Sequence, residues 1–221
     1  MSQALLESWP GLAFVALFAY MLGSVSGSLL LGRVRGVDIR TMGSGNAGGT
    51  NAYRTQGTRF ALLVVSVDIG KGALAVLLVP FLVGLLTGLD PLWAAAIAGL
   101  FAVVGHIWPL YHRFRGGKGA ATAVGAVLAI LPWLAVPMFL VWVLVLILTG
   151  WVSAATLAAA GSLPLCLWLL ADAHPAHWLF SLGLLLLVVY AHRSNVLRLL
   201  RGEEYRFDKA RVFRKTDSGQ D

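Results

Sequence analysis

The chain has 221 residues, of which 58% are hydrophobic and only 12% charged, with a formal net charge of +7 and a mean hydropathy of +0.80. This composition lies outside the range of soluble globular proteins, so we expect an all-α integral membrane protein without a separate soluble domain. The single cysteine, Cys166, lies in an apolar run, which excludes disulfides and a cysteine metal cluster.

Six long apolar runs are candidates for membrane spans, because about 20 mostly apolar residues are needed to cross the bilayer core. The uncharged runs are 11–32, 91–111, 119–149, 151–171 and 173–191. The run 60–88 contains two charges, Asp68 and Lys71, one helical turn apart. Charges within a membrane tend to pair, so we predict a structural ion pair here in preference to contact with a substrate. No basic stretch precedes the first run, so we expect a span there rather than a cleaved signal peptide.

The positions of the basic residues predict the orientation of the chain. Five arginines lie between the first two runs, three basic residues follow the 91–111 run, and eight follow His192, so that only Lys71 falls elsewhere. Positively charged loops are retained on the cytoplasmic side of a membrane. We therefore expect these three regions in the cytoplasm, with the N-terminus outside and the C-terminus inside.

The run 119–149 decides the number of crossings. As one span it gives six crossings and leaves the basic C-terminal region outside. Proline cannot continue the hydrogen-bond ladder of a helix, so a break at Pro132 and Pro137 gives two spans and seven crossings. The first of these, 119–131, is short, at roughly 20 Å. We predict a bundle of seven transmembrane helices, with one membrane domain over 1–204 and a cytoplasmic polar tail over 205–221.

Three polar segments lie on the predicted cytoplasmic side. They are GSGNAGGTNAYR at 43–54, VGHIWPLYHRFRGGKGAAT at 104–122 and HRSNVLRLLRGEE at 192–204. Glycines let a backbone approach a ligand closely, and consecutive N–H groups can converge on an anion. Lys118 adds a positive charge beside a helix that we expect to begin near Gly119. Together the segments predict a phosphate site at the membrane surface.

Each segment taken alone has a simpler interpretation. Stretches of Gly, Ser and Asn are usually loops. Basic residues at the ends of spans usually contact anionic headgroups, which is how we interpret Arg33, Arg35 and most of the tail. A histidine at a helix end is more often an interfacial anchor than a catalyst. The presence of all three segments on one face of the membrane is what favours a site.

The motifs GSGNAGGTN (43–51), GHIWPLYHRFRGGKGAAT (105–122) and HRSN with LLRGEE (192–204) closely resemble the three signature segments of the bacterial acyl-phosphate:glycerol-3-phosphate acyltransferases. The motif set is long and specific. The similarity covers residues 11–204 and includes DIGKG at 68–72, whereas the tail lies outside it. The residues that depart from the family pattern are Ala47, Gly49, Ala191 and Ser194, and the polar positions are intact.

The resemblance implies transfer of a fatty acyl group from an acyl phosphate to the 1-hydroxyl of glycerol 3-phosphate. The products are lysophosphatidic acid and inorganic phosphate, in the first acylation of phospholipid biosynthesis. An acyl phosphate is already activated, so no cofactor, coenzyme A or metal is expected, and positioning with charge stabilisation suffices. The implied location is the bacterial cytoplasmic (inner) membrane, in multi-pass form. The implied partners are both substrates and membrane lipids, with no nucleic acid, and the enzyme that produces the acyl phosphate is a candidate for direct handover.

The candidate site residues come from the three segments and the charged run. We expect catalytic roles for Ser44, Lys118 and His192. We expect substrate binding by Gly43, Asn46, Gly48, Thr50, Asn51, Arg54, His106, Gly116, Gly117, Gly119, Thr122 and Asn195. Glycerol 3-phosphate is assigned to Lys118, Arg54, Ser44 and His192 with Asn195, and phosphoryl oxygens to the glycine loops 43–49 and 116–119. We expect structural roles for Asp68, Lys71 and Glu203, the last by capping a helix or pairing with a neighbouring arginine.

The sequence leaves open which group takes the proton of the substrate hydroxyl. His192 or His106 is suited to act as a general base near neutral pH. A phosphate oxygen of the substrate is also basic in this range and already present, and we favour it slightly over a histidine. The sequence also leaves open which of the two phosphates Lys118 holds, the acyl-chain preference and the oligomeric state.

Three rival functions fit the pattern less well. A phosphate transporter places its binding groups near the midplane, often in repeated halves, whereas these clusters lie at one surface and no repeat is visible. A coenzyme A-dependent acyltransferase usually carries a His-x4-Asp pair, and none of the five histidines has Asp five residues on. A nucleoside-triphosphate loop has Ser or Thr after Gly-Lys, where this chain has Gly119.

Overall fold

The computed structural model of the protein describes residues 9–87, 89–170 and 173–207, and within these ranges all regular elements are helices. The first half contains α2 (Trp9–Gly23), α3 (Gly27–Val34), the 3-10 helix η1 (Ile39–Thr41), α4 (Gly49–Gln56), α5 (Thr58–Thr87) and α6 (Pro91–Ile107). The second half contains the 3-10 helix η2 (Leu110–His112), α7 (Ala120–Ile130), α8 (Pro132–Thr149), α9 (Val152–Leu170), α10 (Pro175–Ala191) and α11 (Arg193–Leu200).

Several of these helices are long and apolar enough to cross a membrane. Five segments meet that condition by length and composition, namely Trp9–Val34, Thr58–Leu82, Pro91–His112, Pro132–Thr149 and Val152–Leu169. A sixth is formed if α10 and α11, which meet at an angle of 59°, count as one broken span. Helix α7 has 11 residues and is shorter than any of these five segments. The described chain is therefore a multi-pass membrane protein, as its composition indicates.

The predicted break in the 119–149 run is confirmed at Pro132. Helix α7 ends at Ile130, and α8 begins with Pro132 at its first position, where the missing N–H has no partner to lose. The second proline, Pro137, lies inside α8 and does not end it. One proline is therefore sufficient to divide the run into two helices.

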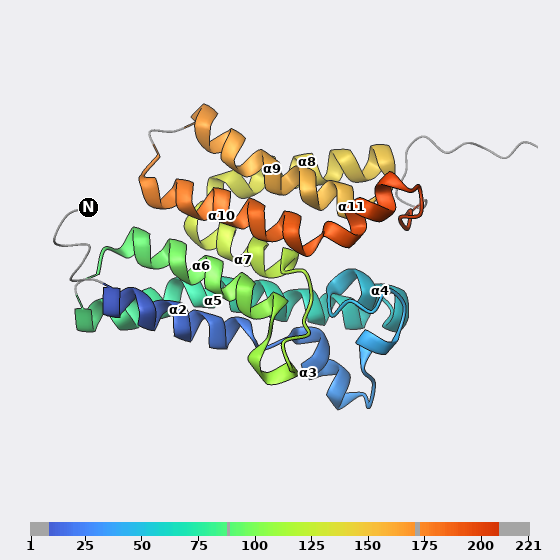
Figure 1. The fold of residues 1–221 in the computed structure, drawn as a ribbon, viewed down its shortest axis with the longest axis horizontal. Coiled ribbons are helices and arrows are strands. Elements are labelled where there is room, and N and C mark those ends of the chain that lie inside the picture. The colour runs from blue at the N-terminus through green and yellow to red at the C-terminus, as the bar shows by residue number, and fades with distance from the viewer. Residues whose placement is uncertain (1–8, 88, 171–172, 208–221) are drawn as a thin grey trace, which may run out of the picture.

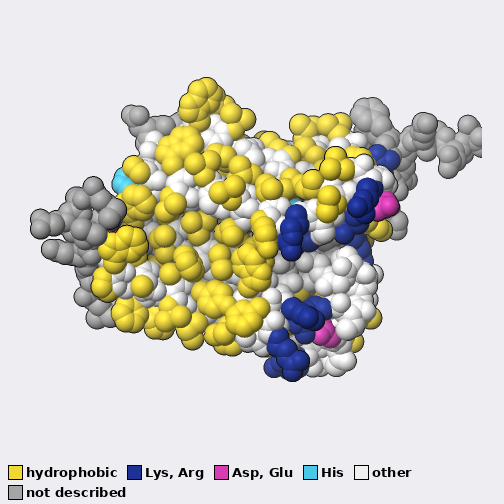
Figure 2. All heavy atoms as spheres, in the orientation of Figure 1, with side chains coloured by type: hydrophobic (Ala, Val, Ile, Leu, Met, Phe, Trp, Pro, Cys, Tyr) yellow, Lys and Arg dark blue, Asp and Glu magenta, His cyan; other side chains and the backbone are white. Residues whose placement is uncertain are grey.

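The bundle has a polar end, where Lys and Arg side chains gather, and an opposite end (Figure 1 and Figure 2). Helices α3, α4 and α11 lie at one end together with the loop between α6 and α7, whereas the α5–α6 and α9–α10 connections lie at the other. Figure 2 shows that hydrophobic side chains cover most of the visible surface, while Lys and Arg gather at the end that carries α3, α4 and α11. Of the 18 residues of α8, only Leu134 is buried, as suits a helix that faces lipid.

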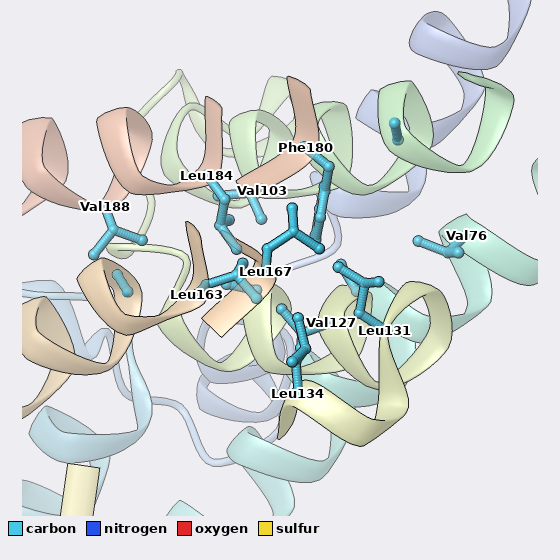
Figure 3. Close-up of a cluster of buried hydrophobic side chains, with 14 of the residues drawn as sticks. Val76, Val103, Val127, Leu131, Leu134, Leu163, Leu167, Phe180, Leu184 and Val188 are labelled. Carbon is cyan, nitrogen blue, oxygen red and sulfur yellow. The ribbon is translucent and has the colours of Figure 1, made fainter. Parts of the chain in front are cut away.

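Large apolar side chains form the main core between α6, α7, α8, α9 and α10 (Figure 3). Phe180 and Leu184 of α10 pack with Leu163 of α9 and with Leu131 at the α7–α8 junction, and all four are at most 1% exposed. This cluster holds the short helix α7 in the middle of the bundle, which in turn places its first residues next to the polar end.

Small residues allow α5 and α7 to approach closely. A Cβ atom on Gly72 of α5 would overlap the carbonyl of Thr122, and one on Gly125 of α7 would overlap the carbonyl of Ile69. Backbones that pack at this distance bring the charged turn of α5 against the first turn of α7, as glycines do in other membrane helix pairs. The two intramembrane charges therefore lie beside the polar end of the bundle.

Candidate active site

A pocket of about 340 Å³ lies at the polar end of the bundle. Helices α4, α5, α6, α9 and α11, the start of α7 and the segment after α11 all contribute to its wall. Its lining includes most of the predicted site residues, namely Ser44, Asn46, Gly48, Thr50, Asn51, Arg54, His106, Lys118, Gly119, His192 and Asn195, together with Asp68 and Glu203. The fold thus brings the three polar segments into one cavity.

The loop before α4 is held in shape by Asn51. Its Oδ1 accepts a hydrogen bond from the N–H of Ser44 at 2.9 Å, and its Nδ2 donates to the carbonyls of Ile39 and Met42 at 2.9 and 3.0 Å. Gly43 adopts φ +57°, and a Cβ there would overlap Asn51. We predicted that Asn51 binds substrate, but its amide is occupied by the loop, so that Ser44 is presented on the pocket wall.

The Gly116-Gly117 turn differs from the anion cradle that we expected. The N–H of Gly116 donates to the carbonyl of Ile107, and the N–H of Gly117 donates to that of His106, both at 3.2 Å. These bonds satisfy carbonyls at the end of α6, which have no partner within the helix. A Cβ on either glycine would overlap His106. The glycines therefore permit close approach to α6, and their N–H groups do not line an anion site.

The start of α7 supplies backbone donors in their place. Gly119 adopts φ +79° at the N-cap and lines the pocket with Ala120 and Ala121. The first N–H groups of a helix have no partner within it, and the helix dipole places partial positive charge there. The prediction of a helix that begins near Gly119 and faces the site is confirmed.

Lys118 is part of a hydrogen-bonded chain of polar side chains. Its Nζ donates to Oδ1 of Asn195, and Nδ2 of Asn195 donates to Oε1 of Glu204 at 2.7 Å. Ser153 donates to the same oxygen at 2.8 Å, and Nε of Arg198 donates to Oε2 at 2.8 Å. We refer to Lys118, Asn195, Glu204 and Arg198 as the pocket network. It joins the loop before α7 to α9 and α11.

The surroundings of Lys118 and Glu204 shift the pKa values of these two groups. Burial lowers the pKa of Lys118 to about 8, with repulsion from Arg198 and Arg54 adding to it and Glu204 opposing it. Burial would raise the pKa of Glu204, but hydrogen bonds from Asn195, Ser153 and Arg198 outweigh it and leave that pKa below its usual value. Near neutral pH the cations therefore outnumber this single carboxylate.

The predicted ion pair within α5 is confirmed. Oδ1 of Asp68 lies 3.0 Å from Nζ of Lys71, and both side chains are at most 4% exposed. The same Oδ1 accepts from the N–H of Gly27 at 3.1 Å, and Lys71 also donates to the carbonyl of Val25 at 2.6 Å. The pair therefore ties α5 to the bend between α2 and α3.

His106 belongs to the same buried cluster. Its Nδ1 lies 2.8 Å from Nζ of Lys71 and 3.2 Å from Oγ1 of Thr122. An ammonium group only donates, so Nδ1 accepts and a neutral His106 carries its proton on Nε2. We refer to Asp68, Lys71, His106 and Thr122 as the bundle network. In this arrangement His106 has no lone pair available to act as a base.

A neutral His192 carries its proton on Nδ1, the opposite ring nitrogen from that in His106. It lies between α10 and α11, is 5% exposed and lines the pocket. Its Nδ1 lies 2.9 Å from the carbonyl of Val188, and a carbonyl only accepts, so Nδ1 carries the proton. The lone pair of a neutral His192 is then on Nε2, where it remains available to a ligand.

For two residues after α11, the structure refines or changes the role that we predicted. We expected Glu203 to cap a helix or to pair with an arginine. Its N–H donates to the carbonyl of Arg198 at 2.8 Å and so caps the end of α11, whereas the arginine is paired with Glu204. Tyr205, which we placed in the tail, lines the pocket with its ring 3.7 Å from the guanidinium carbon of Arg54. The remainder of the tail, 208–221, lies outside the described residues. A pair of adjacent glutamates does not indicate which one turns inward, so no sequence signal distinguished them.

A second pocket of about 300 Å³ lies at the Gly116–Lys118 turn and shares Asn46 and Lys118 with the first. Its wall combines aromatic side chains with cations, namely Trp108, Phe114, Tyr190, Arg115 and Arg193.

Among the residues that the structure describes, no group of three or more His, Cys, Asp or Glu side chains is placed to hold a metal ion.

An apolar helix bundle with cations converging at one end is the architecture of an integral membrane protein with a pocket suited to an anion. The model of the glycerol-3-phosphate acyltransferase family matches residues 13–202, and the chain belongs to this family. The glycerol-3-phosphate acyltransferase of Thioalkalivibrio sulfidiphilus is 42% identical over 193 residues, which cover 86% of this chain and 91% of the relative. That of Aquifex aeolicus is 38% identical over 196 residues, covering 88% and 98%.

Two solved structures of a glycerol 3-phosphate acyltransferase are also similar to this chain. The crystal structure of PlsY (YgiH), an integral membrane glycerol 3-phosphate acyltransferase, in its glycerol 3-phosphate form has a TM-score of 0.79 and 35% identity and covers 89% of this chain and 95% of that one. The lysophosphatidic acid form has a TM-score of 0.78 and 34% identity, covering 88% and 94%. The protein is therefore an acyltransferase enzyme.

Proposed function

We propose that the protein transfers a fatty acyl group from an acyl phosphate to the 1-hydroxyl of glycerol 3-phosphate. The observation that carries this proposal is the pocket, where Arg54, Lys118 and Arg198 converge from three separate elements. Of these cations, Arg198 alone is paired with a carboxylate among the described residues, so positive charge remains for a phosphate. A site of this kind at the end of an apolar bundle suits one soluble phosphate and one phosphate that carries a lipid tail.

Glycerol 3-phosphate is assigned to the first pocket. Lys118 and Arg54 hold its phosphate, with Ser44 and His192 beside Asn195 completing the set of polar groups. Asn46, Gly48 and Thr50 form the adjoining wall. The N–H groups at the start of α7, from Gly119 onward, add partial positive charge to the same site.

The acyl phosphate is assigned to the second pocket. Its aromatic wall suits a hydrocarbon chain, and Arg115 and Arg193 suit a phosphate. Lys118 borders both pockets, which supports the proposal that it lies between the two substrates. In this arrangement Lys118 stabilises negative charge on either phosphate as the acyl group moves between them.

In the reaction, the 1-hydroxyl oxygen attacks the carbonyl carbon and forms an ester bond. The bond between the carbonyl carbon and the phosphate oxygen breaks, and inorganic phosphate leaves with the bonding electron pair. The hydroxyl proton passes to a phosphate oxygen, which we favour, or to Nε2 of His192. His192→Ala distinguishes these routes: a raised KM with little change in kcat supports the phosphate, whereas a large loss of kcat supports a histidine base.

We further propose that the chain crosses the bacterial inner membrane seven times as a single membrane domain over 1–204, with the site on the cytoplasmic face. The separation of α7 from α8 supports this count, because α7 then adds a crossing to the five long segments and the bent α10–α11 pair. A reporter fused after Asp221 is expected to be cytoplasmic. A reporter found outside the membrane would contradict the count.

The reaction is tested with the detergent-purified protein, palmitoyl phosphate and glycerol 3-phosphate. We expect release of phosphate together with formation of lysophosphatidic acid, and formation of both at a rate lower by about 10²- to 10³-fold with Lys118→Met. Palmitoyl-coenzyme A in place of palmitoyl phosphate is expected to give no lysophosphatidic acid. Absence of both products would contradict the proposal. Flux of glycerol 3-phosphate into vesicles without any ester formation would favour a transporter instead.

A further inference from the structure

The segment 203–207, which we refer to as the strap, follows α11 and borders the first pocket. It lies beyond residue 202, where the match to the family model ends. At its start the N–H of Glu203 donates to the carbonyl of Arg198 at 2.8 Å, and at its end the N–H of Phe207 donates to the carbonyl of Gly150 at 2.7 Å. The strap therefore connects α11 to the turn between α8 and α9.

Side-chain contacts also hold the strap on the α8–α9 turn and on α4. Nε of Arg206 donates to the carbonyl of Thr149 at 3.0 Å, and its guanidinium carbon lies 4.8 Å from the centre of the Trp151 ring. The ring of Phe207 meets that of Tyr53 edge to face, with centres 5.8 Å apart. These contacts fix the strap to the α8–α9 turn and to α4, so that Tyr205 is held between anchored residues.

Tyr205 lies against a cation that has few other partners. The guanidinium carbon of Arg54 is 3.7 Å from the centre of the Tyr205 ring, which is the shortest cation–ring distance among the described residues. Nε of Arg54 is buried and has no hydrogen-bond partner among those residues. Of the hydrogen bonds, ion pairs and cation–ring contacts in the described part of the chain, the contact with Tyr205 is thus the one that orients this side chain.

Stacking on a ring occupies the face of a guanidinium and leaves its edge available. The N–H donors of arginine lie in the plane of the group, in the arrangement that matches two oxygens of a phosphate. A guanidinium fixed over the ring of Tyr205, with its carbon 3.7 Å from the ring centre, therefore loses less side-chain entropy on binding a phosphate than an unsupported arginine does.

We propose that Tyr205 is a positioning residue that holds the guanidinium of Arg54 in the orientation that binds the phosphate of glycerol 3-phosphate. This role rests on the proposed function, since it requires Arg54 to contact that substrate. It adds a binding determinant from the strap, outside the part of the chain that matches the family model.

The test compares steady-state kinetics of Tyr205→Leu, Tyr205→Phe and the parent enzyme with glycerol 3-phosphate as the varied substrate. Tyr205→Leu removes the ring, and we expect the KM for glycerol 3-phosphate to rise about three- to ten-fold with kcat nearly unchanged. Tyr205→Phe keeps an aromatic face and is expected to restore the KM. The matched control is Tyr111→Leu, since Tyr111 is 50% exposed against 52% for Tyr205 and lines neither pocket.

Two outcomes would overturn the role of Tyr205. A parental KM for Tyr205→Leu would show that Arg54 does not need the ring. A KM for Tyr205→Phe as high as that of Tyr205→Leu would show that the hydroxyl acts instead. Active-site titration of each purified variant corrects kcat for unfolded protein, and KM does not depend on that fraction, so partial misfolding does not obscure the result.

Arg54→Ala separates this inference from the proposed function. An unchanged KM for Arg54→Ala would overturn both, because Arg54 would then not bind substrate. A raised KM for Arg54→Ala with a parental KM for Tyr205→Leu would overturn only the role of Tyr205. We expect the double variant Arg54→Ala/Tyr205→Leu to have the KM of Arg54→Ala alone, because a residue that acts through another adds nothing once that partner is absent.

Discussion

The two polar networks border the same pocket but are organised in opposite ways. In the bundle network the carboxylate of Asp68 offsets the ammonium of Lys71, and Asp68, Lys71 and His106 are 1%, 4% and 2% exposed. In the pocket network Arg198 pairs with the carboxylate of Glu204, and Lys118 is connected to that carboxylate only through the amide of Asn195. The nearby Arg54 has no acidic partner among the described residues.

The difference between the networks follows from where each one lies. A charge within the apolar bundle is stable only when it is balanced and hydrogen-bonded, so the bundle network is neutral and serves the architecture. A charge at the polar end is partly hydrated and can remain in excess until an anion arrives. We therefore expect substitutions in the bundle network to reduce stability, and substitutions in the pocket network to reduce binding and turnover.

The largest effect on stability is expected from Asp68→Ala. This change leaves the ammonium of Lys71 buried without its carboxylate, which typically costs about 3–5 kcal/mol of unfolding free energy. Thermal unfolding in detergent measures the loss. The double variant Asp68→Leu/Lys71→Leu removes both charges and is expected to unfold at a higher temperature than the single variant. Equal stability of Asp68→Ala and the parent protein would contradict the distinction between the networks.

The largest effect on activity is expected from Lys118→Met. We expect kcat/KM to fall by about 10²- to 10³-fold, because a positioned charge that stabilises phosphate in the transition state is lost. The unfolding temperature is expected to change little, since the substitution also removes a partly buried charge. If Lys118→Met instead unfolds at a lower temperature while its correctly folded fraction retains full activity, the role of Lys118 is structural.

The pH dependence of kcat/KM tests whether the charged ammonium of Lys118 is needed for activity. Burial lowers the pKa of Lys118 to about 8, so the ammonium is charged below that pH and becomes neutral as the pH rises through it. We expect kcat/KM, which reports on the free enzyme, to decline above about pH 8. Lys118→Arg keeps its charge throughout this range and is expected to show no such decline. A decline of the same size in Lys118→Arg would assign the titration to another group.

The smallest effect is expected from Ser153→Ala. It removes one of the hydrogen bonds to Glu204 and leaves those from Asn195 and Arg198, so we expect KM for glycerol 3-phosphate to rise about three-fold. The control is Ser162→Ala, in which a second serine of α9 loses only a bond to the carbonyl of Ala159 in its own helix. A larger change in KM for Ser162→Ala than for Ser153→Ala would contradict the role given to the pocket network.

The sequence predicted local features well and tertiary ones less well. The pairing of Asp68 with Lys71 follows from helical spacing, and the break at Pro132 follows from the missing N–H. The direction of the Gly116 and Gly117 N–H groups was not predictable, because their acceptors are carbonyls of α6 and no residue type indicates that contact. The choice of Glu204 over Glu203 depends on how the chain turns after Gly202, which adopts φ +72°.

Composition and pattern alone determined that this chain is a multi-pass membrane protein with three polar segments suited to phosphate. Those properties depend on residue type and spacing, which the sequence states directly. Only the tertiary structure decided that Lys118 bonds to Asn195, 77 residues away, and that Tyr205 lies on Arg54. Such contacts depend on how α7, α9 and α11 pack around the pocket, and packing is a sum of many weak interactions that no single motif encodes.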